Sequence, residues 1–302
     1  MPELVHLAIP AFLTLLVVEA VVSAVHAQRE AREGSAPSAV GYAPRDTAAS
    51  LAMGIGNVVV NLATKGLVFG VLQGIYTHRI FELGSGPLVL AAAILAEDFV
   101  YYWNHRAGHE VRFFWAAHVT HHSSQHYNLS TALRQTWTGW PQRVLFYWPL
   151  PLLGLDPMLL LTASSVSLIY QFWIHTEYLD RLPRWLEWVL NTPSHHRVHH
   201  GTDVEYLDRN HAGILIVWDR LFGTFEPERQ RPTYGLTKNL ESHNPITIAF
   251  HEWAAMARDV WHARSWRERV GYVLGPPGWS PDGSRQTARE LRSALGAGAQ
   301  AV

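Results

Sequence analysis

Long apolar runs separated by short polar segments dominate the first third of the chain. Residues 4–25 form one such run, residues 49–76 form a second, and residues 86–103 form a third that ends in FVYYW. Each run is close to the ~20 residues that a helix needs to cross the ~30 Å core of a bilayer. We therefore expect residues 1–94 to contain membrane helices. The first is predicted to be retained rather than cleaved as a signal peptide, because no Lys or Arg precedes Arg29.

Two further apolar stretches follow. Residues 143–174 are interrupted by Pro149, Pro151 and Pro157, which predicts a helical hairpin that enters and leaves the membrane from one side. Residues 246–261 are typical of an amphipathic helix that lies on a membrane surface, although a core helix has the same pattern.

These patterns predict an all-α integral membrane protein. We expect a bundle of about four to five membrane helices with a cytosolic helical region that carries clustered histidines. Residues 95–280, which include the hairpin, are predicted to form one catalytic domain. Residues 281–302 are rich in Ala and Gly and are predicted to be a flexible tail.

Composition supports a membrane location. Apolar residues make up 48% of the chain and charged residues only 16%, below the ~25% of a typical soluble protein. The net charge of -1 and the lack of a basic helix argue against a nucleic-acid partner. Basic residues between the first two runs, such as Arg29, Arg32 and Arg45, favour the cytoplasmic side for that loop. A multi-pass protein with its active site on the cytoplasmic side is therefore expected.

Histidines carry the most specific chemical signal. Three clusters contain nine of the eighteen: His105 and His109; His118, His121 and His122; His195, His196, His199 and His200. The motif HRAGH spaces two imidazoles at i and i+4, and HVTHH and HRVHH each space three at i, i+3 and i+4. These spacings place each set on one helical face. Neutral imidazole is the commonest metal ligand, and cysteine is absent. Three such faces offer at least eight nitrogens, so we predict two neighbouring metal ions.

Other residues near these clusters have weaker signals. His175 follows the hairpin and is predicted to be a ninth ligand. Asp98 lies two helical turns before His105 and is predicted to accept a hydrogen bond from that imidazole. Glu110 could accept a proton or bind a metal or a polar cofactor, and a solvated surface acid is the alternative. For His211 we expect a structural role.

The histidine motifs, in this order and spacing, resemble those of the fatty acid hydroxylase and sterol desaturase superfamily. The stretches HVTHHSSQHYNLSTALRQ, YQFWIHTEYL, NTPSHHRVHHG and LIVWDRLFGTFEPE are similar to its alkylglycerol monooxygenase branch. The resemblance implies two iron ions, O2 as oxidant, a lipid substrate from the bilayer and an external electron donor, which is tetrahydrobiopterin in that branch. It also implies that Glu110 is important for activity. The iron ligands implied are His105, His109, His118, His121, His122, His196, His199 and His200, with His175 completing the set.

The leading hypothesis is thus a di-iron oxygenase that hydroxylates a lipid C–H bond; beside an ether oxygen, the product would collapse and cleave the ether. A sterol or fatty-acyl desaturase would use the same centre. A zinc-dependent membrane hydrolase is the alternative from another class, because histidines also bind zinc. A metal transporter would instead place polar ligands along a path near the membrane midplane.

Overall fold

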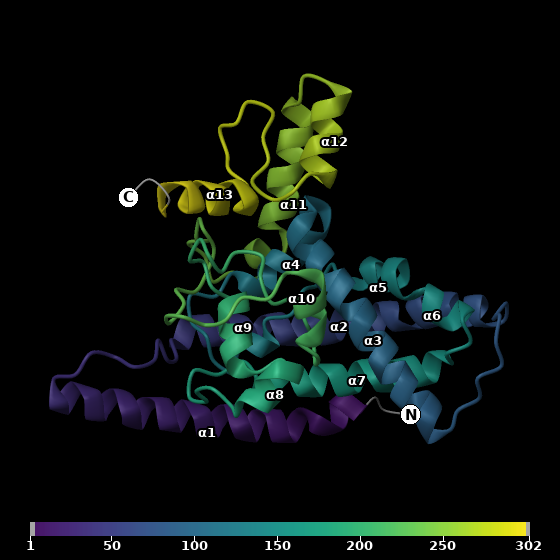
Figure 1. Cartoon of the computed structure of the whole chain (residues 1–302), viewed down its shortest axis with the longest axis horizontal. Helices are drawn as coiled ribbons and strands as arrows, with labels where there is room; N and C mark the ends of the chain where they lie inside the picture. The colour runs from purple at the N-terminus through teal and green to yellow at the C-terminus, as the bar shows by residue number, and fades with distance from the viewer. Residues whose placement is uncertain (1–3, 300–302) are drawn as a thin grey trace.

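The computed structural model describes residues 4–299 of the chain, and helices dominate this part (Figure 1). The only extended pairings in it are two isolated bridges, Leu190 with Leu215 and Gly201 with Tyr234. The helices are α1 (Leu4–Glu33), α2 (Pro44–Tyr76), α3 (Pro87–Glu110), α4 (Arg112–His122), η1 (Thr131–Leu133), α5 (Trp140–Tyr147), α6 (Pro149–Leu152), α7 (Pro157–Trp173), α8 (Arg184–Val189), α9 (Pro193–His199), α10 (Val217–Phe222), α11 (Pro245–His262), α12 (Trp266–Leu274) and α13 (Ala288–Ala299). The all-α class is confirmed.

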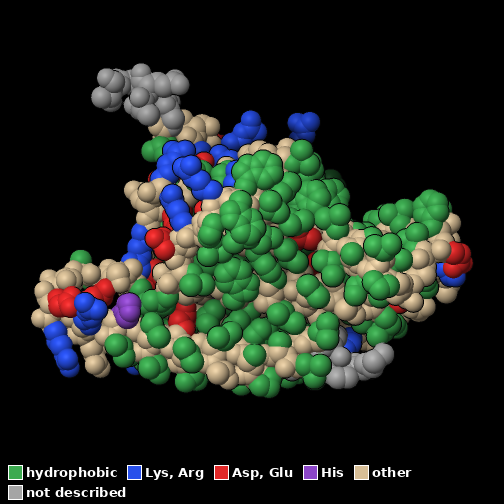
Figure 2. All heavy atoms as spheres, turned by 60° about the horizontal axis from the view of Figure 1, so that its bottom comes forward, with side chains coloured by type: hydrophobic (Ala, Val, Ile, Leu, Met, Phe, Trp, Pro, Cys, Tyr) green, Lys and Arg blue, Asp and Glu red, His purple; other side chains and the backbone are tan. Residues whose placement is uncertain are grey.

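Two of these helices are long enough and apolar enough to cross a membrane, over Leu7–Glu33 and Pro44–Tyr76. They expose most of their apolar side chains; Val17 and Val21 on α1 are 59% and 57% exposed. Hydrophobic side chains cover much of the face that contains α1, whereas charged side chains gather at the left of the view and above it (Figure 2). A core helix would bury this surface, so the exposure favours a bilayer as its partner.

The predicted hairpin differs from expectation in its first arm. Prolines divide that arm into the short helices α5 and α6, and only the second arm, α7, is a continuous helix of 17 residues. Proline cannot donate the helical hydrogen bond and clashes with the preceding turn, which explains the break. The amide of Ile80 donates to the Leu152 carbonyl at 2.8 Å, which joins the 77–85 turn to the hairpin tip.

Buried polar contacts attach the two N-terminal helices to the segment that follows α4. Asp46 on α2 accepts from Arg134 Nη1 at 2.8 Å and from the Ser124 hydroxyl at 2.6 Å. Glu19 on α1 accepts from the Leu129 amide at 2.7 Å and from the hydroxyl of Thr176. A buried ion pair is costly to break once formed, so these contacts hold the histidine-bearing segments against the apolar helices.

The C-terminal region projects from this body as α11 and α12 (Figure 1). Helix α11 is amphipathic, as predicted: Ile248, Ala249 and Met256 are buried, whereas Trp261 is 83% exposed. Trp253 of this helix donates to the Thr138 hydroxyl at 3.1 Å, so it packs against the protein. Part of the predicted flexible tail is helical, because α13 covers Ala288–Ala299.

Candidate metal centre

The structure brings together all nine histidines that the sequence nominated as ligands. They form two groups, in each of which the candidate ligand atoms lie within 4.8 Å of one another. We call them site A (His105, His109, His118, His122 and His199) and site B (His121, His175, His196 and His200). The sites adjoin, since the rings of His122 and His200 stack at 4.4 Å between centroids.

Each HxxHH motif contributes to both sites. From α4, His118 and His122 belong to site A and His121 belongs to site B. From α9 and the residue after it, His199 belongs to site A, and His196 and His200 belong to site B. Adjacent residues on a helix differ by about 100° in direction, so neighbouring imidazoles can face two different ions. The motif therefore builds two sites side by side rather than one crowded site.

The donor set fits metal ions. The Nε2 atoms of His105 and His118 are 2.9 Å apart, and those of His175 and His196 are 3.0 Å apart. The Nε2 atoms of His109, His199 and His200 are buried and make no hydrogen bond within the described chain. A buried polar atom without a partner costs about 1–3 kcal/mol, so convergent unpaired nitrogens point to ions as their missing partners.

Backbone carbonyls orient several of these rings through the other nitrogen. The Nδ1 atoms of His105, His175 and His199 lie 2.7, 2.7 and 2.9 Å from the carbonyl oxygens of His211, Gln171 and Arg209, respectively. This contact fixes the tautomer that leaves Nε2 free to bind a metal. Sequence reasoning missed these partners, because a carbonyl is present at every residue and has no sequence signal.

Asp98 does not hold His105, which corrects the prediction. Its buried carboxylate accepts from the amides of Ile214 and Leu215 at 2.7 and 3.1 Å and from Trp218 Nε1 at 2.9 Å. Both ring nitrogens of His105 face other atoms. Spacing along α3 indicated the correct helical face, but the 211–218 segment supplies the donors that the carboxylate needs. Asp98 thus positions the segment whose His211 carbonyl orients His105.

Glu110 lies at the rim rather than inside either site. Its side chain is 48% exposed, and it accepts from Arg106 Nε at 2.9 Å. Arg106 in turn donates to the Tyr102 hydroxyl at 3.2 Å, which lies 2.9 Å from that of Thr224. The contacts of Glu110 are therefore those of a group that faces the solvent side of the centre.

The remaining histidines near the motifs fall outside both sites. His195 is buried, with Nδ1 3.3 Å from the Thr192 hydroxyl, and His126 is half-buried. His211 is fully buried, and its ring lies 5.0 Å from that of His109. His211 therefore lies beside site A, and no sequence signal indicated this position because His211 is isolated from the motifs.

Burial lowers the pKa of His118, His122 and His199 well below 6.5, and neighbouring imidazoles lower it further. Below pH 6.5 these histidines bind protons in the unfolded chain but not in the folded, metal-free chain. Acid therefore favours unfolding. We expect the chelated protein to lose up to about 1.4 kcal/mol per pH unit for each such histidine below pH 6.5. Thermal unfolding of detergent-solubilised, chelated protein at pH 7.5 and 5.5 measures this, and an unchanged midpoint would contradict it.

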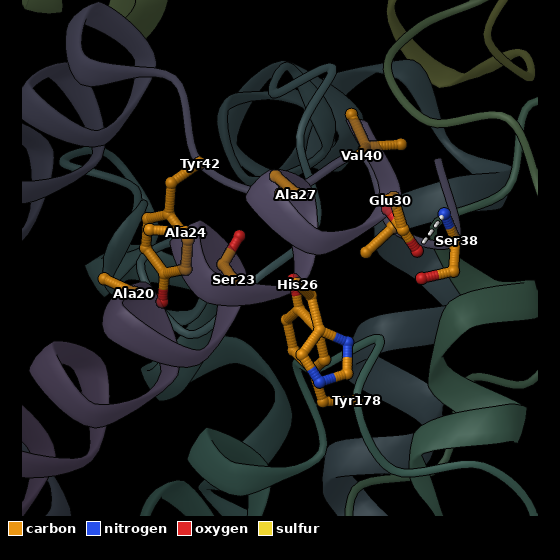
Figure 3. A pocket seen from close by; sticks show the side chains of 12 residues that line it. Ala20, Ser23, Ala24, His26, Ala27, Glu30, Ser38, Val40, Tyr42 and Tyr178 are labelled. Atoms are coloured by element: carbon orange, nitrogen blue, oxygen red, sulfur yellow. Dashed lines mark hydrogen bonds between the residues drawn. The ribbon is translucent and has the colours of Figure 1, made fainter. Parts of the chain in front are cut away.

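A separate pocket lies between α1 and residues 38–42 (Figure 3). His26 contacts Tyr178 edge to face at 5.6 Å, and Glu30 accepts from the Ser38 amide at 3.0 Å. None of the nine clustered imidazoles lines this pocket. The metal chemistry and this pocket are therefore distinct features.

The geometry defines two adjacent groups of histidines that could each bind a metal ion, in a helical scaffold with two helices apolar enough to cross a membrane. Residues 90–224 match the model of the fatty acid hydroxylase family. The resemblance drawn from the histidine motifs is thereby confirmed.

Curated relatives extend the similarity beyond that domain. The chain is 38% identical to the alkylglycerol monooxygenase of Homo sapiens, over 93% of this chain and 61% of the relative, and 39% identical to that of Xenopus tropicalis, over 78% and 53%. An ornithine lipid hydroxylase of Rhizobium tropici is 29% identical over 48% of this chain and 44% of its own length. The chain spans less than two thirds of the length of these relatives. No solved structure matches it significantly.

Proposed function

We propose that this protein is a membrane di-iron oxygenase that uses O2 to hydroxylate a lipid C–H bond, with cleavage of an alkylglycerol ether as the specific reaction. The observation that carries the proposal is the pair of adjacent, all-imidazole sites inside the segment that matches the fatty acid hydroxylase family. The relatives named alkylglycerol monooxygenase support the ether-lipid substrate.

Sites A and B would each hold one iron ion, and the pair would supply O2 activation when bound. Imidazole is a suitable ligand for iron. The chain itself buries these ligands and encloses them with aromatic rings: Trp115 lies 5.3 Å from His109, and Tyr127 lies 5.1 Å from His200, between ring centroids. Exclusion of water by such walls protects reactive species from side reactions.

The overall reaction balances with an external two-electron donor. One oxygen atom of O2 enters the lipid as a hydroxyl group, and the other leaves as water with two protons and the two electrons. Hydroxylation of the carbon beside an ether oxygen gives a hemiacetal, which collapses to a fatty aldehyde and an alcohol. Tetrahydrobiopterin is the proposed donor, and Glu110 at the rim is placed to interact with a polar donor molecule from the solvent side.

We further propose a multi-pass arrangement of about four to five membrane helices, with the catalytic domain over residues 95–280 and its centre on the cytoplasmic side. Arg29 and Arg32 at the C-terminal end of α1 support this orientation. The apolar helices would deliver a lipid directly from the bilayer. Asp98 contributes by positioning the segment that orients a ligand.

Product analysis tests the proposal. Iron-loaded protein in lipid nanodiscs, supplied with tetrahydrobiopterin, an alkylglycerol and ¹⁸O₂, should release fatty aldehyde and consume oxygen. A hydroxylated acyl chain without aldehyde would favour the lipid hydroxylase activity named for the Rhizobium relative. A new double bond would indicate a desaturase, and turnover unaffected by the removal of oxygen would indicate a zinc hydrolase.

A further inference from the structure

We infer that His211 lines site A and donates a hydrogen bond to a small molecule or anion bound there. His211 does not itself bind the metal. This inference rests on the proposed function only in requiring a metal ion at site A. It assigns a role to an imidazole that lies outside all three histidine motifs.

The first observation is a buried imidazole whose hydrogen bonding is incomplete. His211 is 0% exposed; its ring has a backbone contact with Asp208, and neither Nδ1 nor Nε2 makes a hydrogen bond of full geometry within the described chain. A buried polar ring normally has a partner, because an unmade hydrogen bond costs free energy that packing alone does not restore. The missing partner is therefore something that the protein binds.

The second observation is the position of this ring. Its centroid lies 5.0 Å from that of His109, 5.8 Å from His105 and 5.9 Å from His199, all members of site A. Yet His211 is not among the residues whose ligand atoms lie within 4.8 Å of one another. Five imidazoles would hold an ion at site A, and a bound ion could also take a small molecule or anion as a further ligand. A ring just outside the ligand set is placed to contact such a further ligand.

The third observation is that the backbone around His211 is held firmly. Asp219 accepts from the amides of His211 and Ala212 at 2.7 and 2.8 Å, while the His211 carbonyl lies 2.7 Å from His105 Nδ1. Asp208 and Asn210, just before it, have φ values of +50° and +56°. Non-glycine residues adopt this region at a cost that the surrounding contacts must offset, a pattern found at ligand-binding segments. The backbone that carries the ring is thus fixed beside site A.

Azide is the probe for this role, because it binds open positions on iron and accepts hydrogen bonds. In iron-loaded protein, His211→Phe should keep the metal content and weaken azide binding about tenfold, the effect of losing one hydrogen bond to a charged group. His211→Gln keeps a donor and should restore most of the affinity. His126→Phe, which alters a half-buried imidazole outside both sites, is the control and should leave the azide dissociation constant unchanged.

The outcomes separate this inference from the proposed function. Unchanged azide affinity in His211→Phe overturns the inference alone, and loss of one metal ion from that variant shows instead that His211 is a ligand. Should His211→Phe fail to fold, His211→Ala is expected to show the same weakening, and azide affinity equal to that of the wild type would overturn the inference. Wild-type protein that binds no iron counts against the proposed function itself.

Discussion

Replacement of His199 by alanine is expected to lower lipid turnover by at least ~1,000-fold and to leave about one iron ion per chain instead of two. Loss of an outer partner of a metal ligand typically costs 10- to 100-fold, and loss of the ligand itself should cost more. The His199 ring packs at 4.4 Å from His105 and 4.7 Å from His122, so no neighbouring side chain can replace it without disturbing site A. Metal analysis by mass spectrometry and oxygen consumption measure the two effects.

Matched variants show whether the loss of iron and activity comes from site A, from site B or from neither site. His196→Ala removes a member of site B and should also abolish turnover while sparing the ion of site A, and His121→Ala should behave in the same way. His126→Ala changes an imidazole outside both sites and should retain wild-type iron and activity. Full activity in His199→Ala or His121→Ala would remove the basis for the proposed ligand set.

Removal of the Asp98 carboxylate is expected to have the second-largest effect. Asp98→Ala leaves the Ile214 and Leu215 amides and Trp218 Nε1 without their acceptor in a buried setting. We expect a loss of about 3–5 kcal/mol of stability, since each orphaned donor costs about 1–3 kcal/mol and part of this is relieved by relaxation. The 211–218 segment should then loosen, and site A should bind its ion less tightly because the His211 carbonyl no longer orients His105.

Thermal unfolding and iron content, measured on the same detergent-solubilised preparation, check this expectation. Asp98→Asn keeps an acceptor oxygen and nearly the same volume, so its loss of stability should be smaller. A direct role for Asp98 as hydrogen-bond acceptor of His105 would instead reduce iron binding without a large change in the unfolding temperature of the metal-free protein. The metal-free comparison therefore distinguishes the two roles.

Much of the fold follows from patterns that act within single helices. The apolar runs predicted α1, α2 and α3, because the length of an apolar run sets the thickness of bilayer core that a helix can span. The helix break at Pro149 and Pro151 also follows from the local sequence. How it divides the first hairpin arm, however, depended on how the short helices α5 and α6 pack. The number of membrane spans beyond α1 and α2 remains a prediction, since it depends on packing against a bilayer.

The sequence by itself determined which histidines share a helical face, because i, i+3 and i+4 spacing is a property of one helix and the motifs carry it locally. Only the tertiary structure decided how α4 and α9 divide their imidazoles between sites A and B, and that His211 joins the wall of site A. It also decided the partners of Asp98, which come from a segment more than one hundred residues away along the chain. Contacts of this kind depend on where separate elements meet in space, and neither spacing nor composition encodes that meeting point directly.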